Sequence, residues 1–264
     1  MKKISGFFNL VKIQTKMNLI SMFRYKMSLI TEILLFVGIY IMIIFSNDYM
    51  VMNRYYGANF DDSRILVLIG YLFWQISSIA LGLSSSAISN GLREGTLEMK
   101  TQGNYSLTVI YFIDTITRAL YSLIIIAILI FITMIISEVN SSDLLSLIKI
   151  IPIMLPSIVG MFGIGLVMSG FTLMERNISQ VILLIQGSIL ILSTTTNPSI
   201  NLFNKIIPFV KGVDISRNIY LNLIVNLKDV FYYLFINFLW VVFGHIIFNN
   251  MIKRVRYKGS FTKF

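Results

Sequence analysis

The stretch ALYSLIIIAILIFITMII, residues 119–136, decides the fold of this chain. It contains no charged residue, and its length is close to the roughly 20 residues that a helix needs to cross a hydrocarbon core. Inside a bilayer only helices and closed barrels satisfy their own backbone hydrogen bonds. We therefore expect residues 119–136 to form a transmembrane helix.

The composition of the whole chain agrees with this expectation. Of the 264 residues, 56% are hydrophobic and 13% are charged, whereas soluble domains carry about 25% charged residues. The excess of apolar side chains must therefore face lipid. In so apolar a chain, the net charge of +10 fits loops held at an anionic inner leaflet better than nucleic-acid binding. We expect contact with the lipid bilayer and no nucleic-acid partner.

Further apolar runs lie on both sides of residues 119–136. They predict additional spans at residues 27–45, 65–88, 150–173, 180–192 and 230–248. The run at 180–192 is short for a membrane crossing. A short helix at 109–118 is expected to approach the membrane, and interfacial helices are expected within 193–229. The predicted fold class is therefore an all-α membrane protein of about six transmembrane helices.

No polar block between these runs is long enough for a separate soluble domain. Residues 1–264 are expected to form one domain: an interfacial helix at 1–26, a six-span bundle at 27–248 and a basic tail at 249–264. On a helical wheel, 1–26 places Ser5, Asn9, Lys12 and Lys16 on one face, opposite apolar residues. This pattern is typical of an amphipathic helix in the plane of the membrane surface. A solvated basic tail is the alternative, because isolated short helices are marginal in water.

The distribution of Lys and Arg predicts the orientation of the helices. Most of the 22 basic residues fall in the termini and in loops on the same side of the predicted membrane, and such loops stay cytoplasmic. We therefore expect a multi-pass protein with both termini cytoplasmic. The Ile-, Lys- and Asn-rich composition is typical of a low-GC bacterial chain, which places it in a bacterial plasma membrane.

The polar segment NGLREGTLE, residues 90–98, lies between two predicted spans. Glu94 and Glu98 are four residues apart, so on a short helix they would share one face. Leu92 and Leu97 would then be available to bury against another surface, such as a partner protein. A solvated loop without a docking role is the alternative.

This segment resembles the loop after the second span of type-2 ATP-binding cassette (ABC-2) permeases. The interfacial helix, the order of spans and the Pro-containing segment before the last span also agree, and one departure is Asn104, where a proline usually follows the motif. The resemblance implies that the loop and the N-terminal helix contact a cytoplasmic ABC ATPase subunit, with Arg93, Glu94 and Glu98 as contact residues. The residues that match the motif are Glu94, Gly95, Thr96, Leu97 and Glu98.

Ionisable residues also occur close to or inside the predicted spans. Asp114 and Arg118 are four residues apart at a membrane border, which predicts a helical ion pair. Such a pair would neutralise charge near the headgroups, or would act as a lever that holds the approach helix as the ATPase moves. Glu32 lies within the first span, where an ionisable residue indicates a functional role, and Arg24 or Lys26 could also pair with it.

Uncharged polar residues inside the spans predict contacts between helices. We expect the amides of Gln75, Gln186 and Asn237 to bond across helices, with the lining of a substrate path as the alternative. A second pattern repeats every four residues and predicts a shallow ridge that lets another helix approach closely. Its members are Ser78, Gly82, Ser86 and Asn90.

The absence of several sequence motifs limits the classes of function that we expect. The chain has no Gly-x-x-x-x-Gly-Lys-Ser/Thr loop, no Cys and a single His, so we expect no ATP hydrolysis, no metal site and no enzyme activity. By resemblance, the chain is expected to be the permease of an ABC exporter. It would pair with a second permease chain, identical or related, and with an ATPase subunit that binds ATP, to expel an amphipathic drug, peptide or lipid-like substrate. An ion-driven carrier and a non-transporting scaffold or immunity protein are the alternatives.

Overall fold

The computed structural model describes residues 2–46, 49–57, 59–137, 141–175, 178–195, 197–199, 201 and 204–257. These residues are mostly helical, and no strand occurs among them. The elements are α1 (Lys2–Arg24), α2 (Lys26–Phe45), α3 (Tyr49–Tyr56), α4 (Phe60–Arg93), α5 (Leu97–Gln102), α6 (Leu107–Ile136), α7 (Ser141–Glu175), α8 (Ser179–Leu192), the 3₁₀ helix η1 (Asn204–Ile206), α9 (Val210–Tyr220) and α10 (Leu227–Tyr257).

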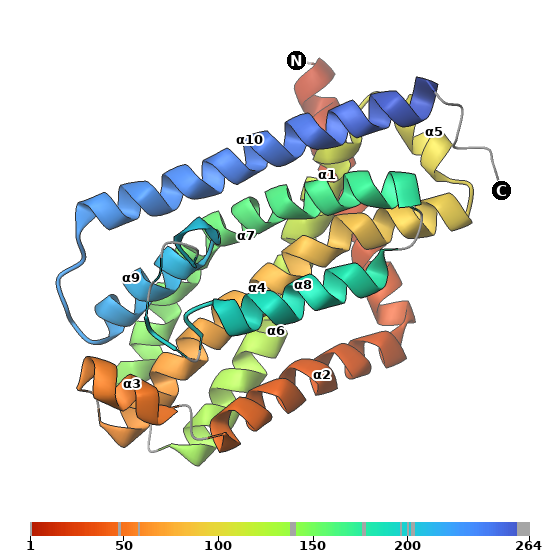
Figure 1. The fold of residues 1–264 in the computed structure, drawn as a ribbon. Coiled ribbons are helices and arrows are strands. Elements are labelled where there is room, and N and C mark those ends of the chain that lie inside the picture. Colours follow the sequence, from red (N-terminus) through yellow and green to blue (C-terminus); the bar gives the residue numbers. More distant parts are fainter. Residues whose placement is uncertain are drawn as a thin grey trace.

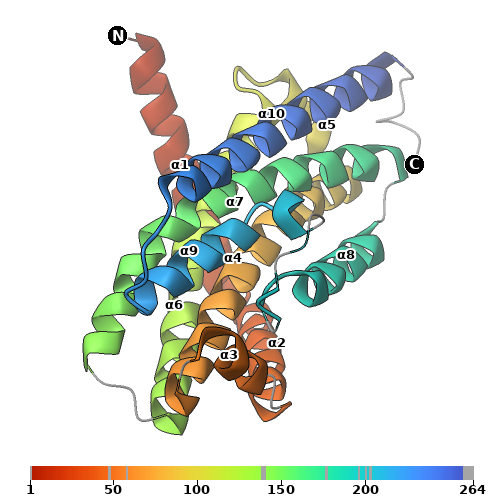
Figure 2. The same cartoon turned by 60° about the vertical axis from the view of Figure 1, so that its left-hand side comes forward.

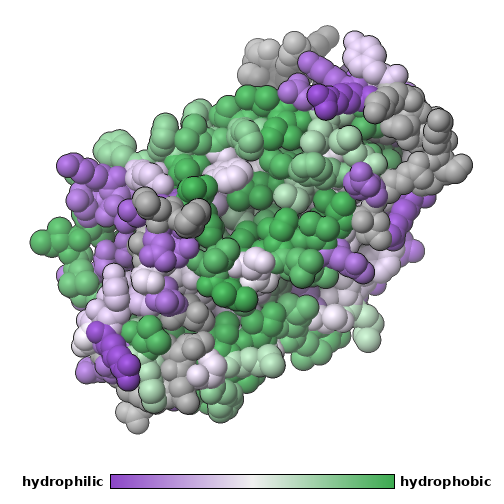
Figure 3. Space-filling model, viewed as in Figure 1, coloured by the Kyte–Doolittle hydropathy of each residue, from purple (hydrophilic) through white to green (hydrophobic). Residues whose placement is uncertain are grey.

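Five helical segments are long and apolar enough to cross a membrane, by length and composition. They are Lys26–Phe45, Asp62–Arg93, Leu107–Ile136, Asp143–Glu175 and Leu227–Tyr257. The remaining predicted span, residues 180–192, corresponds to α8 (Ser179–Leu192), which is apolar but has 14 residues. At 1.5 Å per residue it is about 21 Å long, shorter than a hydrocarbon core. Figure 3 shows a broad hydrophobic band between two more hydrophilic ends. This surface is compatible with a multi-pass membrane protein.

Two predicted boundaries are wrong. The approach helix at 109–118 and the span at 119–136 form one continuous helix, α6, which begins at Leu107 because Ser106 caps its N-terminus and accepts a bond from the Val109 N–H. The last span also continues past residue 248, since α10 ends at Tyr257. Much of the predicted basic tail is therefore helical, and residues 258–264 lie outside the described residues.

Helix α4 occupies the centre of the bundle, where α6, α7, α8 and α9 pack around it (Figure 1). Of its most apolar 18-residue stretch, 89% is buried inside the bundle. Close approach of α7 depends on Gly165, since a Cβ there would lie 2.8 Å from the Leu81 carbonyl oxygen of α4. Gly165 of α7 therefore packs against α4 within the chain.

The backbones of helices α7 and α10 touch where the helices cross, because glycines face each other there. A Cβ on Gly244 would collide with the Gly163 backbone, and a Cβ on Gly163 would collide with the Trp240 backbone. The Tyr233 hydroxyl donates to the Ile153 carbonyl at 2.6 Å and accepts from the Ser157 N–H at 3.1 Å. It thus satisfies backbone groups next to the helix-interrupting Pro156.

The two ends of the bundle carry different elements. Figures 1 and 2 place α1, α5 and the last turns of α10 at one end, and α3 and α9 at the other. At the first end, the Arg256 guanidinium donates to the Thr101 carbonyl at 3.0 Å, and the rings of Phe7 and Tyr105 lie 6.5 Å apart. The N-terminal helix, the 90–98 loop and the end of α10 therefore share one end of the molecule.

Candidate functional site

The loop after α4 is built on a glycine turn. Glu94 is the C-cap of α4, and Gly95 follows with φ +66°, a conformation that costs glycine little because it has no Cβ. The Thr96 N–H bonds to the Gly91 carbonyl at 2.9 Å and the Gly95 N–H to the Leu92 carbonyl at 3.4 Å. This is the Schellman pattern of helix termination, so Gly95 has a structural role.

The turn changes the predicted arrangement of the loop residues. Glu94 is the C-cap of α4 and Glu98 lies in the first turn of α5, so the prediction that they share one face of a single short helix is wrong. Leu92 and Leu97 are 8% and 2% exposed and pack in the core of this chain. They are therefore not available to a partner.

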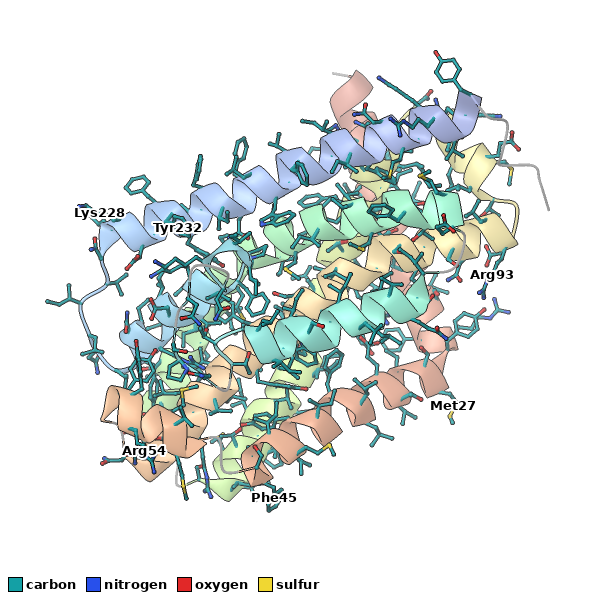
Figure 4. All side chains as sticks on the ribbon, in the orientation of Figure 1. Met27, Phe45, Arg54, Arg93, Lys228 and Tyr232 are labelled. Atoms are coloured by element: carbon teal, nitrogen blue, oxygen red, sulfur yellow. The ribbon has the colours of Figure 1, made fainter. Side chains whose placement is uncertain are left out.

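Three charged side chains of the loop remain on the surface. Arg93, Glu94 and Glu98 are exposed, and Figure 4 shows Arg93 at the end of the bundle opposite Phe45 and Arg54. Thr96 is half-buried beside them. The loop thus combines an apolar underside that is anchored in the bundle with a charged outer face.

The predicted ion pair between Asp114 and Arg118 is also wrong. The Asp114 carboxylate accepts bonds from the side-chain amides of Gln14 at 2.8 Å and Asn18 at 2.7 Å, both on α1. The Arg118 guanidinium instead lies 2.6 Å from the Glu32 carboxylate of α2, so the ion pair of Glu32 is with Arg118 and not with its neighbours Arg24 and Lys26. The physical reason is tertiary: α1 and α2 approach α6 from two sides, and each offers a better-placed group than the adjacent helical turn.

These contacts place Gln14 and Asn18 of α1 against the bundle, whereas Asn9, Lys12 and Lys16 of the predicted polar face are exposed. Gln14 and Asn18 point to α6, whereas apolar side chains on α1 remain in the open: Phe8 is 68%, Ile13 57% and Met17 60% exposed. Such exposure is costly in water. The distribution fits a helix that has lipid beside it.

Glu32, Asp114 and Arg118 line one cavity of about 630 Å³ between α1, α2, α4, α6 and α8. The predicted ridge of α4 also lies in its wall, with all four members lining it: Ser78, Gly82, Ser86 and Asn90. The ridge therefore admits a neighbouring helix, α8, at Gly82, where a Cβ would lie 3.2 Å from Gln186 Nε2. Beyond that contact it borders open space.

The three amides predicted inside the spans have different surroundings. Gln186 lines the cavity and donates to the Ser78 carbonyl at 2.7 Å, which ties α8 to α4. Asn237 is buried and donates to the Pro208 carbonyl at 3.0 Å. Gln75 is fully buried, and its amide atoms have no hydrogen-bond partner in the described part of the chain. Gln186 and Asn237 thus bond between elements.

Arg217 of α9 is a buried residue that was not singled out from the sequence. It is 1% exposed, and it donates to the Leu66 carbonyl at 2.9 Å and to the Thr195 carbonyl at 3.0 Å. Gly70 leaves room for it, since a Cβ there would lie 2.7 Å from Arg217 Nη2. The signal in the sequence is its helical spacing from Val213, which places Arg217 on the apolar face of α9.

A salt bridge from Lys211 joins α9 to α10 at the α3–α9 end of the bundle. Lys211 lies 3.1 Å from Asp214 and 3.0 Å from Asp229 of α10. Burial alone would lower the pKa of the Lys211 ammonium, but Asp229 and Asp214 together raise it above its ordinary value. The Tyr220 hydroxyl adds a bond to Asp62 of α4 at 2.9 Å. Ion pairs and a hydrogen bond therefore stabilise the α3–α9 end of the bundle, while the cavity lies nearer the other end.

No protein-family model and no curated protein matches this chain.

Proposed function

We propose that this chain is the transmembrane permease subunit of an ABC exporter in a bacterial plasma membrane, with both termini cytoplasmic. One observation carries the proposal. Arg93, Glu94 and Glu98 are displayed on a glycine turn at one end of an apolar helical bundle, in a motif that resembles the ABC-2 loop. A separate ATPase subunit would bind this charged face.

The anchoring of the loop supports a mechanical role. Leu92 and Leu97 pack in one cluster with Leu107 of α6 and Phe248 of α10, so a force on the loop acts on several helices at once. The same helix, α4, carries the ridge that lines the cavity. An ATPase that moves against the loop would therefore displace α4, and α4 would transmit that movement to the cavity.

The flanks of the cavity support pairing with a second permease chain, identical or related. On either side of it, α2 and α8 expose large apolar side chains: Leu34 is 65%, Leu184 71% and Ile191 77% exposed. Lipid or another apolar helix must cover such a surface. A partner chain there would close the cavity into a path for an amphipathic substrate.

Affinity purification from native cells tests the proposal. The detergent-solubilised wild-type chain should bring down an ABC ATPase, identified by mass spectrometry. The variant carrying Glu94→Lys and Glu98→Lys should lose it, because the contact face reverses its charge. Glu175→Lys, an exposed carboxylate at the end of α7, is the matched control and should retain the ATPase. The absence of any ATPase with wild type under mild conditions would refute the proposal.

An ion-driven carrier is a second candidate, which the clustering of Glu32, Asp114 and Arg118 in a cavity favours. Ionisable groups inside a helical bundle are typical of ion and proton pathways. Proteoliposomes that contain the purified chain alone separate the two functions. Substrate movement driven by a pH or sodium gradient without ATPase would support the carrier.

A further inference from the structure

The charges that line the cavity do not cancel. Glu32 and Arg118 neutralise each other at 2.6 Å. The hydrogen-bond partners of Asp114 are the neutral amides of Gln14 and Asn18. Among the described residues that line the cavity, no cation pairs with Asp114, so its carboxylate leaves the wall with a net negative charge. Lys100 of α5 also attracts this carboxylate, but it is exposed and does not line the cavity.

Beside polar residues such as Ser78, Asn90 and Gln186, the wall has a large apolar and aromatic part. Leu35, Phe36 and Ile39 come from α2, Trp74 from α4, and Leu183 and Leu190 from α8. The rings of Phe36 and Trp74 meet edge to face, with centroids 5.8 Å apart. Aromatic faces attract cations as well as apolar groups. A volume of about 630 Å³ is that of a small-molecule pocket.

We propose that this cavity binds an amphipathic organic cation, with its charged group near Asp114 and its apolar part along α2 and α8. The positive charge of Arg118 is already taken up by Glu32, so an anion would meet a net repulsive site. Attraction between the ligand and Asp114 is stronger than in bulk water because Asp114 is half-buried. The bound cation is the cargo only if the proposed permease function holds.

A pair of probes with matched shape and opposite charge tests the proposal. Tetraphenylphosphonium and tetraphenylborate are compared by equilibrium dialysis against the purified full chain in a neutral detergent. We expect the cation to bind at least about tenfold more tightly than the anion. Equal binding of the two ions, or tighter binding of the anion, would overturn the proposal.

Two variants of the cavity should change the affinity in opposite directions. Asp114→Asn keeps a polar group for the α1 amides but removes the uncompensated charge, so tetraphenylphosphonium should bind about tenfold more weakly. Arg118→Gln removes the positive charge, so the same probe should bind more tightly. Glu175→Gln removes a carboxylate outside the cavity and should bind the probe as wild type does. Unchanged affinity in both cavity variants would contradict the proposal even if one of them folded poorly.

The cation could come from the membrane or from the aqueous phase, and competition distinguishes these sources. The chain is placed in nanodiscs of neutral lipid with and without a two-chain cationic lipid. Displacement of tetraphenylphosphonium by that lipid supports a membrane cation, and retention of the probe supports a dissolved one. Because no ATPase is present, a failed ATPase purification with intact cation selectivity refutes the permease function alone. If an ATPase co-purifies but the chain shows no preference for the cation, the cargo class alone is refuted.

Discussion

The α7–α10 pair and the α2–α8 flank are built from similarly apolar helices but pack in opposite ways. At the α7–α10 crossing, Gly163 and Gly244 bring two backbones into direct contact. Across the flank, α8 is joined to α4 by Gln186 and Trp74, whose indole N–H donates to the Gln186 carbonyl at 2.9 Å, and a cavity separates it from α2. Hydrophobicity alone therefore does not decide where a membrane bundle is tight; the placement of small residues does.

The largest effect should follow from filling the tight crossing. Gly244→Leu introduces side-chain atoms where the Gly163 backbone already lies, so we expect a loss of about 3 kcal/mol or more in the free energy of unfolding. Thermal melting of the detergent-purified protein, followed by size-exclusion chromatography, measures it.

The control for this substitution lies in the loose flank. A Cβ on Gly38 of α2 would meet nothing within 4 Å. Gly38→Ala should therefore leave stability unchanged or raise it by up to about 1 kcal/mol, because alanine favours the helix. A large loss of stability in Gly38→Ala would show that the flank is as tightly packed as the α7–α10 pair.

An intermediate effect is expected at Tyr233. Tyr233→Phe removes the hydroxyl that bridges the Ile153 carbonyl and the Ser157 N–H, so two hydrogen bonds between α10 and α7 are lost. Their loss should cost about 1–3 kcal/mol, to be measured as a lower melting temperature. Tyr232→Phe is the matched control, since Tyr232 is half-buried and donates a single bond, to Lys205. An equal loss in the two variants would argue against the bridge.

The smallest effect should come from the cavity. Glu32 and Arg118 are 20% and 27% exposed in their side chains, so solvent screens their attraction. A double-mutant cycle with Glu32→Gln and Arg118→Gln should give a coupling of about 1 kcal/mol, because each single variant leaves one charge without its partner. A coupling of zero would mean that the two groups do not meet in the folded protein.

Prediction from the sequence succeeded where one local pattern sufficed. The runs of apolar residues located α2 and α8 to within a residue or two, and residues 119–136 form the second half of α6. The length of α8 also follows from the sequence, since polar residues bound its run. Contacts between helices were harder to predict, as the Asp114–Arg118 pairing shows: spacing along one helix carries no information about α1 and α2.

In the 90–98 loop, too, the sequence predicted some features and missed others. The pattern at 90–98 identified an exposed charged segment, and Arg93, Glu94 and Glu98 are indeed exposed. It did not reveal that Gly95 ends α4 or that Leu92 and Leu97 are anchors. A glycine in a short polar segment fits a helix end as well as a loop, and the burial of a leucine depends on which helices arrive beside it.

By itself, the sequence determined that this chain forms long apolar helices compatible with a membrane, because hydrophobicity and length are properties of each segment alone. The tertiary structure decided which helices cross closely, which charges meet and where a cavity remains. These features depend on contacts between residues that are 80 or more positions apart, such as Arg118 with Glu32 and Tyr233 with Ile153. Such contacts form only once the helices have packed, so no local pattern specifies them.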